Sequence, residues 1–439
     1  MKKYRLAIVG PADSVALIVS VAQEYSDMEL MPIVYHSARE VPDILNQKIQ
    51  QADAWLFSGI APYNYAIKSG HKERPFVYIP HAGSSLYRIL LQMTLQYGLD
   101  VDKISFDTFS KQDIEEFFAD LAMPTPTYYV KAFTGTETNV DMTAFHEALW
   151  QAGKIKAVVT CFLCTYKNLQ NKGVPVFRIW PTRDNIRSTI DVARRACETV
   201  RFQDSQIAVQ HIRVDDFEKL QRQANSSYDF KRLELRLFEE LVRYVQSIQG
   251  SIVHNGDGRY TVYSTRGSVS TVTSGFRYMP LKESVARQFN FNLSGGIGFG
   301  WTAYDAEHNA MTALGLADQN GVGSWMVVHA DRIAEGPLGS AMTLRYPMTC
   351  SDERMKQTAE ALSVNVTTLN RLLAVKEQIG SREIKADELG LYLSLTARSA
   401  RRLLSLLIEK GLAEVVAEET CGKGRPSKVY RLLLENIND

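Results

Sequence analysis

The sequence predicts a multidomain protein that combines α/β with α+β architecture, and three observations lead to this prediction. Strand-like and helix-like patterns alternate over residues 1–200. A strand, helix, hairpin, strand, helix, strand order follows over 205–340, and a helical segment with concentrated basic residues occupies 351–439. At 439 residues the chain is long enough for two to four domains, each with its own core.

Composition places the chain among soluble globular proteins. Hydrophobic residues make up 45% and charged residues 23%, and the formal net charge of +1 excludes a uniformly basic nucleic-acid coat. No run approaches the ~20 apolar residues of a membrane span. Residues 4–9 have the pattern of a β-strand that leads into a turn, which does not match a signal peptide. We therefore expect a cytoplasmic protein with no membrane partner.

The five cysteines, an odd number at irregular spacing, do not indicate a disulfide framework. Cys161-x-x-Cys164 has no second cysteine pair or histidine pair with which to form a zinc site, and it lies in the apolar run AVVTCFLC. Free cysteines often behave as small buried hydrophobes. We expect buried structural thiols and no metal site; the other cysteines are Cys197, Cys350 and Cys421.

The N-terminal 200 residues predict two small Rossmann-like lobes with parallel sheets, because strands that alternate with helices of this length form βαβ units. The expected strands are 5–10, 28–36, 52–59, 75–80, 127–133, 155–163 and 174–180. The expected helices are 14–25, 41–51, 86–97, 111–120, 142–152 and 183–197.

Loops at the carboxyl ends of these strands are rich in glycine and in hydroxylic residues. In parallel sheets ligands bind at such ends, and helix N-termini there can hold an anion. The alternative is that these residues only form turns and N-caps. The candidate ligand-binding residues are Gly10, Asp13, Ser14, Ser58, Gly59, His81, Gly83, Ser84 and Thr160.

The order GPADS, LFSGIAPYNYAIKSG, YIPHAGSSLYRIL and AVVTCFLCTYKNLQNKGVPVFRI resembles the two-lobed sensory domain of the propionate-catabolism activator family. The resemblance covers roughly residues 1–200. That family senses small metabolites, so the resemblance implies a small-molecule effector for this region.

The middle segment, 205–340, reads as a βαββαβ domain of ferredoxin-like type. Its expected elements are a strand at 207–217, a helix at 231–247, a hairpin at 251–267, a strand with a glycine-rich turn and a helix at 289–317, and a strand at 324–333. Asn255-Gly256 or Asp257-Gly258 supplies the positive-φ turn of the hairpin.

This order resembles the palm domain of diguanylate cyclases, class III cyclases and archaeal GTP cyclohydrolase III, and SGGIGFGWTAYDAEHNAMTAL is similar to the cyclohydrolase III signature. The resemblance implies acids on the first strand and at the hairpin that hold Mg²⁺ against a triphosphate. Arg213 and Arg259 stand where those acids are expected, which favours a non-catalytic palm with no catalytic residues. A purine nucleotide such as GTP remains a candidate ligand, through Asp215, Asp257, Gly295, Gly296 and Gly298. Close backbone packing is the alternative role of the glycine run.

The last segment predicts helix, turn, helix, followed by a short helix at 386–393, a recognition helix at 397–410 and two strands around the loop TCGKGRPSK. Eight basic and four acidic residues between Thr396 and Arg431 give a local net charge of +4. Such a surface fits the phosphates and grooves of duplex DNA. The candidate DNA-binding residues are Thr396, Arg398, Ser399, Arg401, Arg402, Lys423, Arg425, Ser427 and Lys428.

LSLTARSARRLLSLLIEKGLAEV and GKGRPSKVYRL resemble the winged helix-turn-helix of bacterial and archaeal regulators over about 60 residues. Together the segments predict a ligand-responsive transcription regulator whose partners are double-stranded DNA and a small-molecule effector. We expect a homodimer or higher homo-oligomer, because two half-sites increase specificity. The competing hypothesis is a GTP-acting cyclase or cyclohydrolase fused to a DNA-binding domain.

Overall fold

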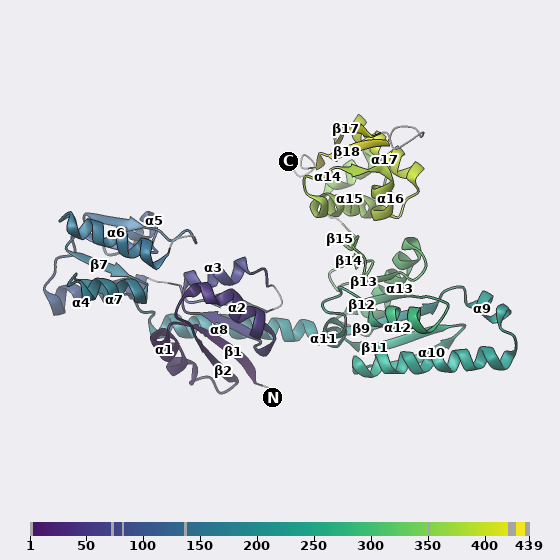
Figure 1. Cartoon of the computed structure of the whole chain (residues 1–439), viewed down its shortest axis with the longest axis horizontal. Coiled ribbons are helices and arrows are strands. Elements are labelled where there is room, and N and C mark those ends of the chain that lie inside the picture. The colour runs from purple at the N-terminus through teal and green to yellow at the C-terminus, as the bar shows by residue number, and fades with distance from the viewer. Residues whose placement is uncertain are drawn as a thin grey trace. The chain divides into compact units, whose positions relative to one another are not determined.

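The structure, a computed structural model, describes residues 3–71, 74–80, 83–135, 138–349, 352–419 and 427–434 (Figure 1). The chain divides into two compact units, Met1–Arg201 and Phe202–Asp439. Helix α8 (Arg183–Asp204) contains the boundary between them.

The first unit begins with a lobe built on a parallel sheet in the order β2-β1-β3-β4. Two buried clusters lie on opposite faces of this sheet: α1 and α8 cover one face, and α2 and α3 cover the other. The elements are β1 (Tyr4–Gly10), α1 (Ala12–Ala22), β2 (Met28–Val34), α2 (Val41–Lys48), β3 (Ala54–Phe57), α3 (Ile60–Lys68) and β4 (Phe76–Tyr78).

The second lobe repeats this architecture, with a parallel sheet in the order β6-β5-β7-β8. Helices α4 and α5 pack on one face, and α6 and α7 on the other. The last helices of the two halves are exchanged, because α4 follows β4 but packs on the second lobe, and α8 follows β8 but packs on the first. The elements are α4 (Gly83–Tyr97), β5 (Ile104–Asp107), α5 (Lys111–Asp120), β6 (Tyr128–Lys131), α6 (Asn139–Gln151), β7 (Ala157–Thr160), α7 (Leu163–Asn171) and β8 (Val176–Arg178).

The prediction of parallel, Rossmann-like sheets is confirmed, but three elements were missed. Strand β5 is only four residues long and lies between charged residues, so no alternation marked it, although it is central in its sheet. Helices α3 and α7 were not among the expected helices. Pro62 lies in the first turn of α3, where a helix tolerates proline, and the apolar run of β7 obscured the start of α7.

The second unit contains a mixed seven-stranded sheet in the order β10-β11-β9-β12-β13-β14-β15. The expected first strand, hairpin and crossover are present, and β12 runs parallel to β13. The expectation that one strand closes this domain at 333 was wrong: a turn follows β13, and two further antiparallel strands extend the sheet. The elements are β9 (Ile207–Val214), α9 (Phe217–Gln223), α10 (Ser227–Ser247), β10 (Ser251–Gly256), β11 (Arg259–Thr265), α11 (Arg266–Val272), α12 (Pro280–Gln288), β12 (Leu293–Gly300), α13 (Ala303–Asn320), β13 (Trp325–Val328), β14 (Ile333–Gly336) and β15 (Leu344–Pro347).

The glycine run lies inside β12, not in the turn that the sequence led us to expect. A Cβ at Gly296 would lie 2.1 Å from the Leu314 amide nitrogen, and one at Gly298 would lie 2.1 Å from the Ala310 amide nitrogen. The missing side chains therefore let the backbone of α13 rest directly on the strand.

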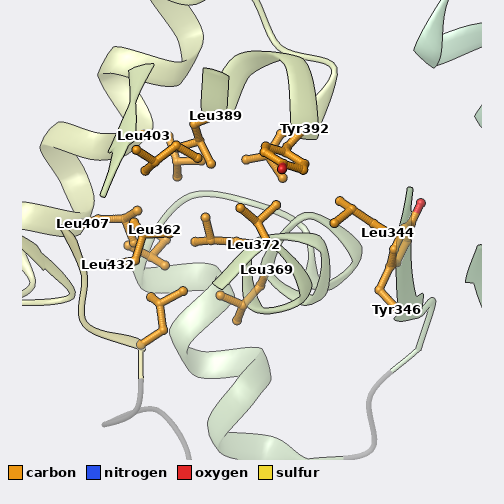
Figure 2. Close-up of a cluster of buried hydrophobic side chains, with 14 of the residues drawn as sticks. Leu344, Tyr346, Leu362, Leu369, Leu372, Leu389, Tyr392, Leu403, Leu407 and Leu432 are labelled. Carbon is orange, nitrogen blue, oxygen red and sulfur yellow. The ribbon is translucent and has the colours of Figure 1, made fainter. Parts of the chain in front are cut away.

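The C-terminal segment folds as four helices and a three-stranded sheet in the order β16-β18-β17. Its leucines form one buried cluster with Leu344 and Tyr346 of β15, so this segment and the central sheet share a core (Figure 2). The expected helices are all present. The elements are α14 (Glu353–Ala361), α15 (Val366–Ile379), β16 (Ile384–Lys385), α16 (Ala386–Leu393), α17 (Ala397–Glu409), β17 (Ala413–Glu419) and β18 (Ser427–Leu432).

Replacing Gly298 by alanine should lower the free energy of unfolding by about 2–3 kcal/mol, because the new methyl group would displace the α13 backbone. Gly315→Ala is the matched control, because Gly315 lies in α13 itself and no heavy atom lies within 4 Å of its ideal Cβ position. We expect the control to be neutral or to stabilise the protein, since alanine favours helices. Urea denaturation of both variants tests this, and equal midpoints would contradict the packing role.

Candidate functional site

A cavity of about 490 Å³ lies where strands of both lobes end in the first unit. Its walls include Ser14, Ser58 and Gly59, three of the predicted ligand-binding residues. Residues that follow β2, β5 and β7, together with the last residue of β8, complete it, and the sequence analysis did not select them: Tyr35, His36, Thr108, Cys161 and Arg178. The rule that ligands bind at strand ends would have found them if β5 had been recognised and if all strands had been treated alike.

The other predicted ligand residues lie around or away from this cavity. Gly10 allows close packing against Ser58, since a Cβ at Gly10 would lie 2.7 Å from the Ser58 side chain. Thr160 is fully buried, whereas Gly83 and Ser84 are exposed on α4 and do not line the cavity. His81 lies outside the described residues. For the residues away from the walls, a ligand role remains a prediction.

Arg178 is the most buried cation of the cavity, with a side chain 5% exposed. Its Nη1 group donates to Asp13 of the first lobe, its Nη2 group donates to Ser14 Oγ at 3.2 Å, and its plane covers Trp180. Its Nε is buried and has no hydrogen-bond partner among the described residues. Burial lowers the pKa of Arg178 to about 10, so the group remains charged at neutral pH.

Three helices begin at the cavity with N-cap residues whose side chains do not cap them. The N-cap residues of α1, α3 and α7 are Pro11, Gly59 and Phe162, and none of them makes a side-chain cap hydrogen bond. By contrast, α5 and α6 both begin with complete capping boxes. Ser14 and Ser58 therefore do not serve as the N-caps that the alternative interpretation required. In the first turn of α1, the Ser14 amide donates instead to the Asp13 carboxylate at 2.6 Å.

A buried hydrogen-bond network fixes the second lobe's side of the cavity. Asp107 accepts hydrogen bonds from Thr160 Oγ1 and, at 2.9 Å, from the Cys161 amide, and it lies 3.2 Å from His146 Nε2. His146 Nδ1 lies 2.7 Å from Ser105 Oγ. Ser105, Asp107 and His146 are all 0% exposed, so this Ser-His-Asp set has no access for a substrate and holds the β7–α7 turn in place.

Thr108 next to this network has φ of 66°, an unfavourable conformation for a β-branched residue. Its hydroxyl donates to the Asp107 carbonyl and lies 2.8 Å from Cys161 Sγ. Thr108 lines the cavity, and strained residues in proteins cluster at ligand-binding and active sites.

The cysteines differ from one another more than expected. Cys197 is buried and Cys161 is partly buried, but Cys164 is exposed at the cavity, so the prediction of a buried thiol was wrong there. Cys164 is in the first turn of α7, a helix that the sequence analysis missed. Burial and the nearby Asp107 carboxylate raise the pKa of Cys161. No group of three or more metal-ligating side chains occurs among the described residues. Cys350 and Cys421 lie outside them.

In the central domain, the arginines that replace the expected acids face each other across paired strands. Arg213 of β9 is directly opposite Arg259 of β11. Arg213 makes a bidentate ion pair with Asp318, at 2.6 and 3.1 Å, and this carboxylate raises its pKa. Asp215 is buried and accepts hydrogen bonds from Ser294 Oγ at 2.9 Å and the Gly323 amide at 2.8 Å. The Asp215 carboxylate, at the end of the first strand, is thus bound to donors of the protein itself.

The remaining predicted nucleotide residues are dispersed. Asp257 is exposed in the β10–β11 turn with φ of 50°, and Gly295, Gly296 and Gly298 are buried within β12. The glycines serve the close packing that the alternative interpretation described. A nucleotide contact for any of these residues remains a prediction.

Helix α17 has two chemically distinct faces. Ala400, Leu403, Leu404 and Leu407 are buried, and Arg398, Ser399, Arg401 and Arg402 are exposed. Thr396 caps the helix by accepting a hydrogen bond from the Ser399 amide at 3.2 Å.

Salt bridges leave part of this charge available. Arg401 pairs with Asp387 at 3.3 Å, whereas Arg398 and Arg402 have no acidic partner in the described chain. Lys428 lies 3.7 Å from Glu418 on the neighbouring strand. Lys423 and Arg425 lie outside the described residues, and Ser427 is described only as the first residue of β18.

The turn between α16 and α17 is tied to the central domain. Ser394 has φ of 57° and donates to Asn320 at the end of α13. Arg371 of α15 donates to Ser394 Oγ at 3.0 Å and to the Tyr392 carbonyl at 2.9 Å. A short path of bonds thus leads from the C-terminal end of α13 to the start of α17.

No protein-family model matches the chain, and no curated protein matches it by sequence. A crystal structure of an NtrC-family transcriptional regulator from Clostridium acetobutylicum aligns with 45% of this chain and 98% of its own, at 16% identity and a TM-score of 0.35. A diguanylate cyclase/phosphodiesterase from Caldicellulosiruptor saccharolyticus aligns with 30% of this chain and 86% of its own, at 14% identity and a TM-score of 0.22. The ABC domain from Streptococcus pneumonia in complex with L-Trp aligns with 46% and 84%, at 12% identity and a TM-score of 0.29. Similarity at this level identifies no function for this chain.

No helix in the described ranges combines the length and the apolar character that crossing a membrane requires.

Iodoacetamide at pH 8 should alkylate Cys164 at least about tenfold faster than Cys161, because Cys164 is exposed, whereas burial and the Asp107 carboxylate raise the pKa of Cys161 and so lower its thiolate fraction. Peptide mass spectrometry over a time course measures both rates. A Cys164→Ser variant controls for the assignment. Equal rates at the two thiols would contradict the exposed position of Cys164.

Proposed function

We propose that this protein is a ligand-responsive, DNA-binding transcription regulator. The observation that carries the proposal is α17, a helix whose apolar face is buried and whose opposite face presents Arg398, Arg401 and Arg402 to solvent. In this proposal α16 and α17 form a helix-turn-helix, and β17 and β18 form the wing of a winged helix. Exposed arginines at the start of a recognition helix can contact bases in the major groove and backbone phosphates.

The effector site of the proposed regulator is the cavity between the two N-terminal lobes. Binding there changes how the lobes close on each other, since Arg178 of the second lobe and Asp13 of the first are already paired. The central domain then passes the change on to the DNA-binding segment, with which it shares a core and the Asn320–Ser394 hydrogen bond. We propose a homodimer as the DNA-bound form, so that the effector alters the spacing of two recognition helices.

Removing positive charge from α17 should weaken DNA binding. We expect Arg402→Ala to reduce operator affinity by about tenfold or more. The slope of log affinity against log salt concentration should become shallower by about one unit, because one phosphate contact is lost. Arg232→Ala, on the exposed surface of α10, removes the same charge at a distance in sequence and serves as the matched control. Gel-shift titrations at several salt concentrations measure both effects; unchanged affinity for Arg402→Ala would rule out this assignment of the recognition helix.

We further propose that the central domain is not a nucleotide-converting enzyme. The ion pair of Arg213 with Asp318 and the bonds that Asp215 makes to Ser294 and Gly323 support this, because a divalent cation needs unoccupied carboxylate oxygens. Incubation of the protein with GTP and Mg²⁺, followed by chromatography of the nucleotides, should show GTP unchanged. A product that disappears in an Asp215→Asn variant would support the enzyme hypothesis instead.

A further inference from the structure

We infer that the cavity between the N-terminal lobes binds a small organic anion, one carboxylate joined to an apolar body about the size of a phenyl ring. This inference names the class of the effector and so rests on the proposed function for its biological role. The binding claim itself stands on the geometry of the cavity.

The first argument is the set of three uncapped helices. α1, α3 and α7 begin at the cavity, and their N-cap residues are proline, glycine and phenylalanine, none of which contributes a capping side chain. First-turn N–H groups and the helix dipoles favour a negative charge at such a point. In α1 the Asp13 carboxylate already accepts a hydrogen bond from the Ser14 amide at 2.6 Å. A ligand carboxylate is therefore expected at the N-termini of α3 and α7.

Arg178 gives the second, independent argument. The residue is 7% exposed, it lines the cavity, and its Nε has no hydrogen-bond partner among the described residues. A buried N–H group without a partner costs free energy, and a bound acceptor would remove that cost. The Asp13 carboxylate accepts from Nη1, so a ligand oxygen that accepts from Nε would not have to displace Asp13.

The charge and shape of the walls define the rest of the ligand. The lining contains Lys167 and Arg178 but no aspartate or glutamate, which favours an anionic over a cationic ligand. Ile60, Phe162 and Ile179 also line the cavity and supply apolar surface. At about 490 Å³ the cavity matches the usual range for small-molecule sites and exceeds what a bare inorganic anion needs.

The test uses the full-length protein and pairs of acids and neutral amides: phenylacetate with phenylacetamide, 3-phenylpropanoate with its amide, and 4-methylpentanoate with its amide. Titration calorimetry measures affinity, and protection of Cys164 from iodoacetamide places the bound probe in the cavity. Arg178→Gln removes the buried cation. Arg183→Gln, an exposed arginine of α8 outside the cavity lining, is the matched control.

We expect at least one acid to bind about tenfold or more tightly than its amide and to protect Cys164. Arg178→Gln should abolish the difference between acid and amide, and Arg183→Gln should retain it. Equal binding of acid and amide, or no binding by any acid, would overturn the inference. If Arg178→Gln does not fold, the acid–amide comparison and the Cys164 protection on the unmodified protein still decide the question.

The two proposals can fail separately. If an acid binds in the cavity but DNA affinity in a gel shift does not change, the ligand class stands and the regulatory function fails. If only the neutral amides alter DNA affinity, the regulatory function stands and the anion inference fails.

Discussion

The ion pair between Arg178 and Asp13 is the contact on which the arrangement of the N-terminal unit depends. It joins the last strand of one lobe to the first helix of the other, and it lies between two adjoining cavities, since Arg178 lines both. Breaking one partner of a buried pair leaves an uncompensated charge and is strongly unfavourable. A ligand that enters the cavity would therefore lie next to a side chain that joins the two lobes.

The exchange of α4 and α8 also joins the two lobes of this unit. Each helix leaves one lobe and completes the core of the other, so neither lobe has a complete core of its own chain segment. Relative motion of the lobes must preserve these two helices. The chain boundary between the two units falls within α8, after Arg201.

In the second unit, the contact between β12 and α13 positions the surface that we assign to DNA. Glycines bring the helix against the strand, the end of α13 carries Asp318 and Asn320, and these residues bind Arg213 and Ser394. Arg213 and the turn before α17 are thus both bound by residues near the C-terminal end of one helix. Arg213 forms an ion pair at the position where the resemblance implies an acid.

The sequence predicted structural elements that depend on neighbouring residues, but it did not predict contacts between residues far apart in the chain. The alternation of strands and helices, the amphipathic pattern of α17, the cap Thr396 and the hairpin turn all depend on residues close in the chain, and the structure confirms them as elements. Ser14, Ser58 and Gly59 followed from the strand-end rule. Arg178 meets Asp13 across 165 positions, the glycine run is a contact surface and not a turn, and β14 and β15 extend the sheet only because Leu344 and Tyr346 find a core among distant leucines. Such pairings depend on which faces meet after the chain has folded. Local sequence patterns do not indicate which distant residues will come into contact.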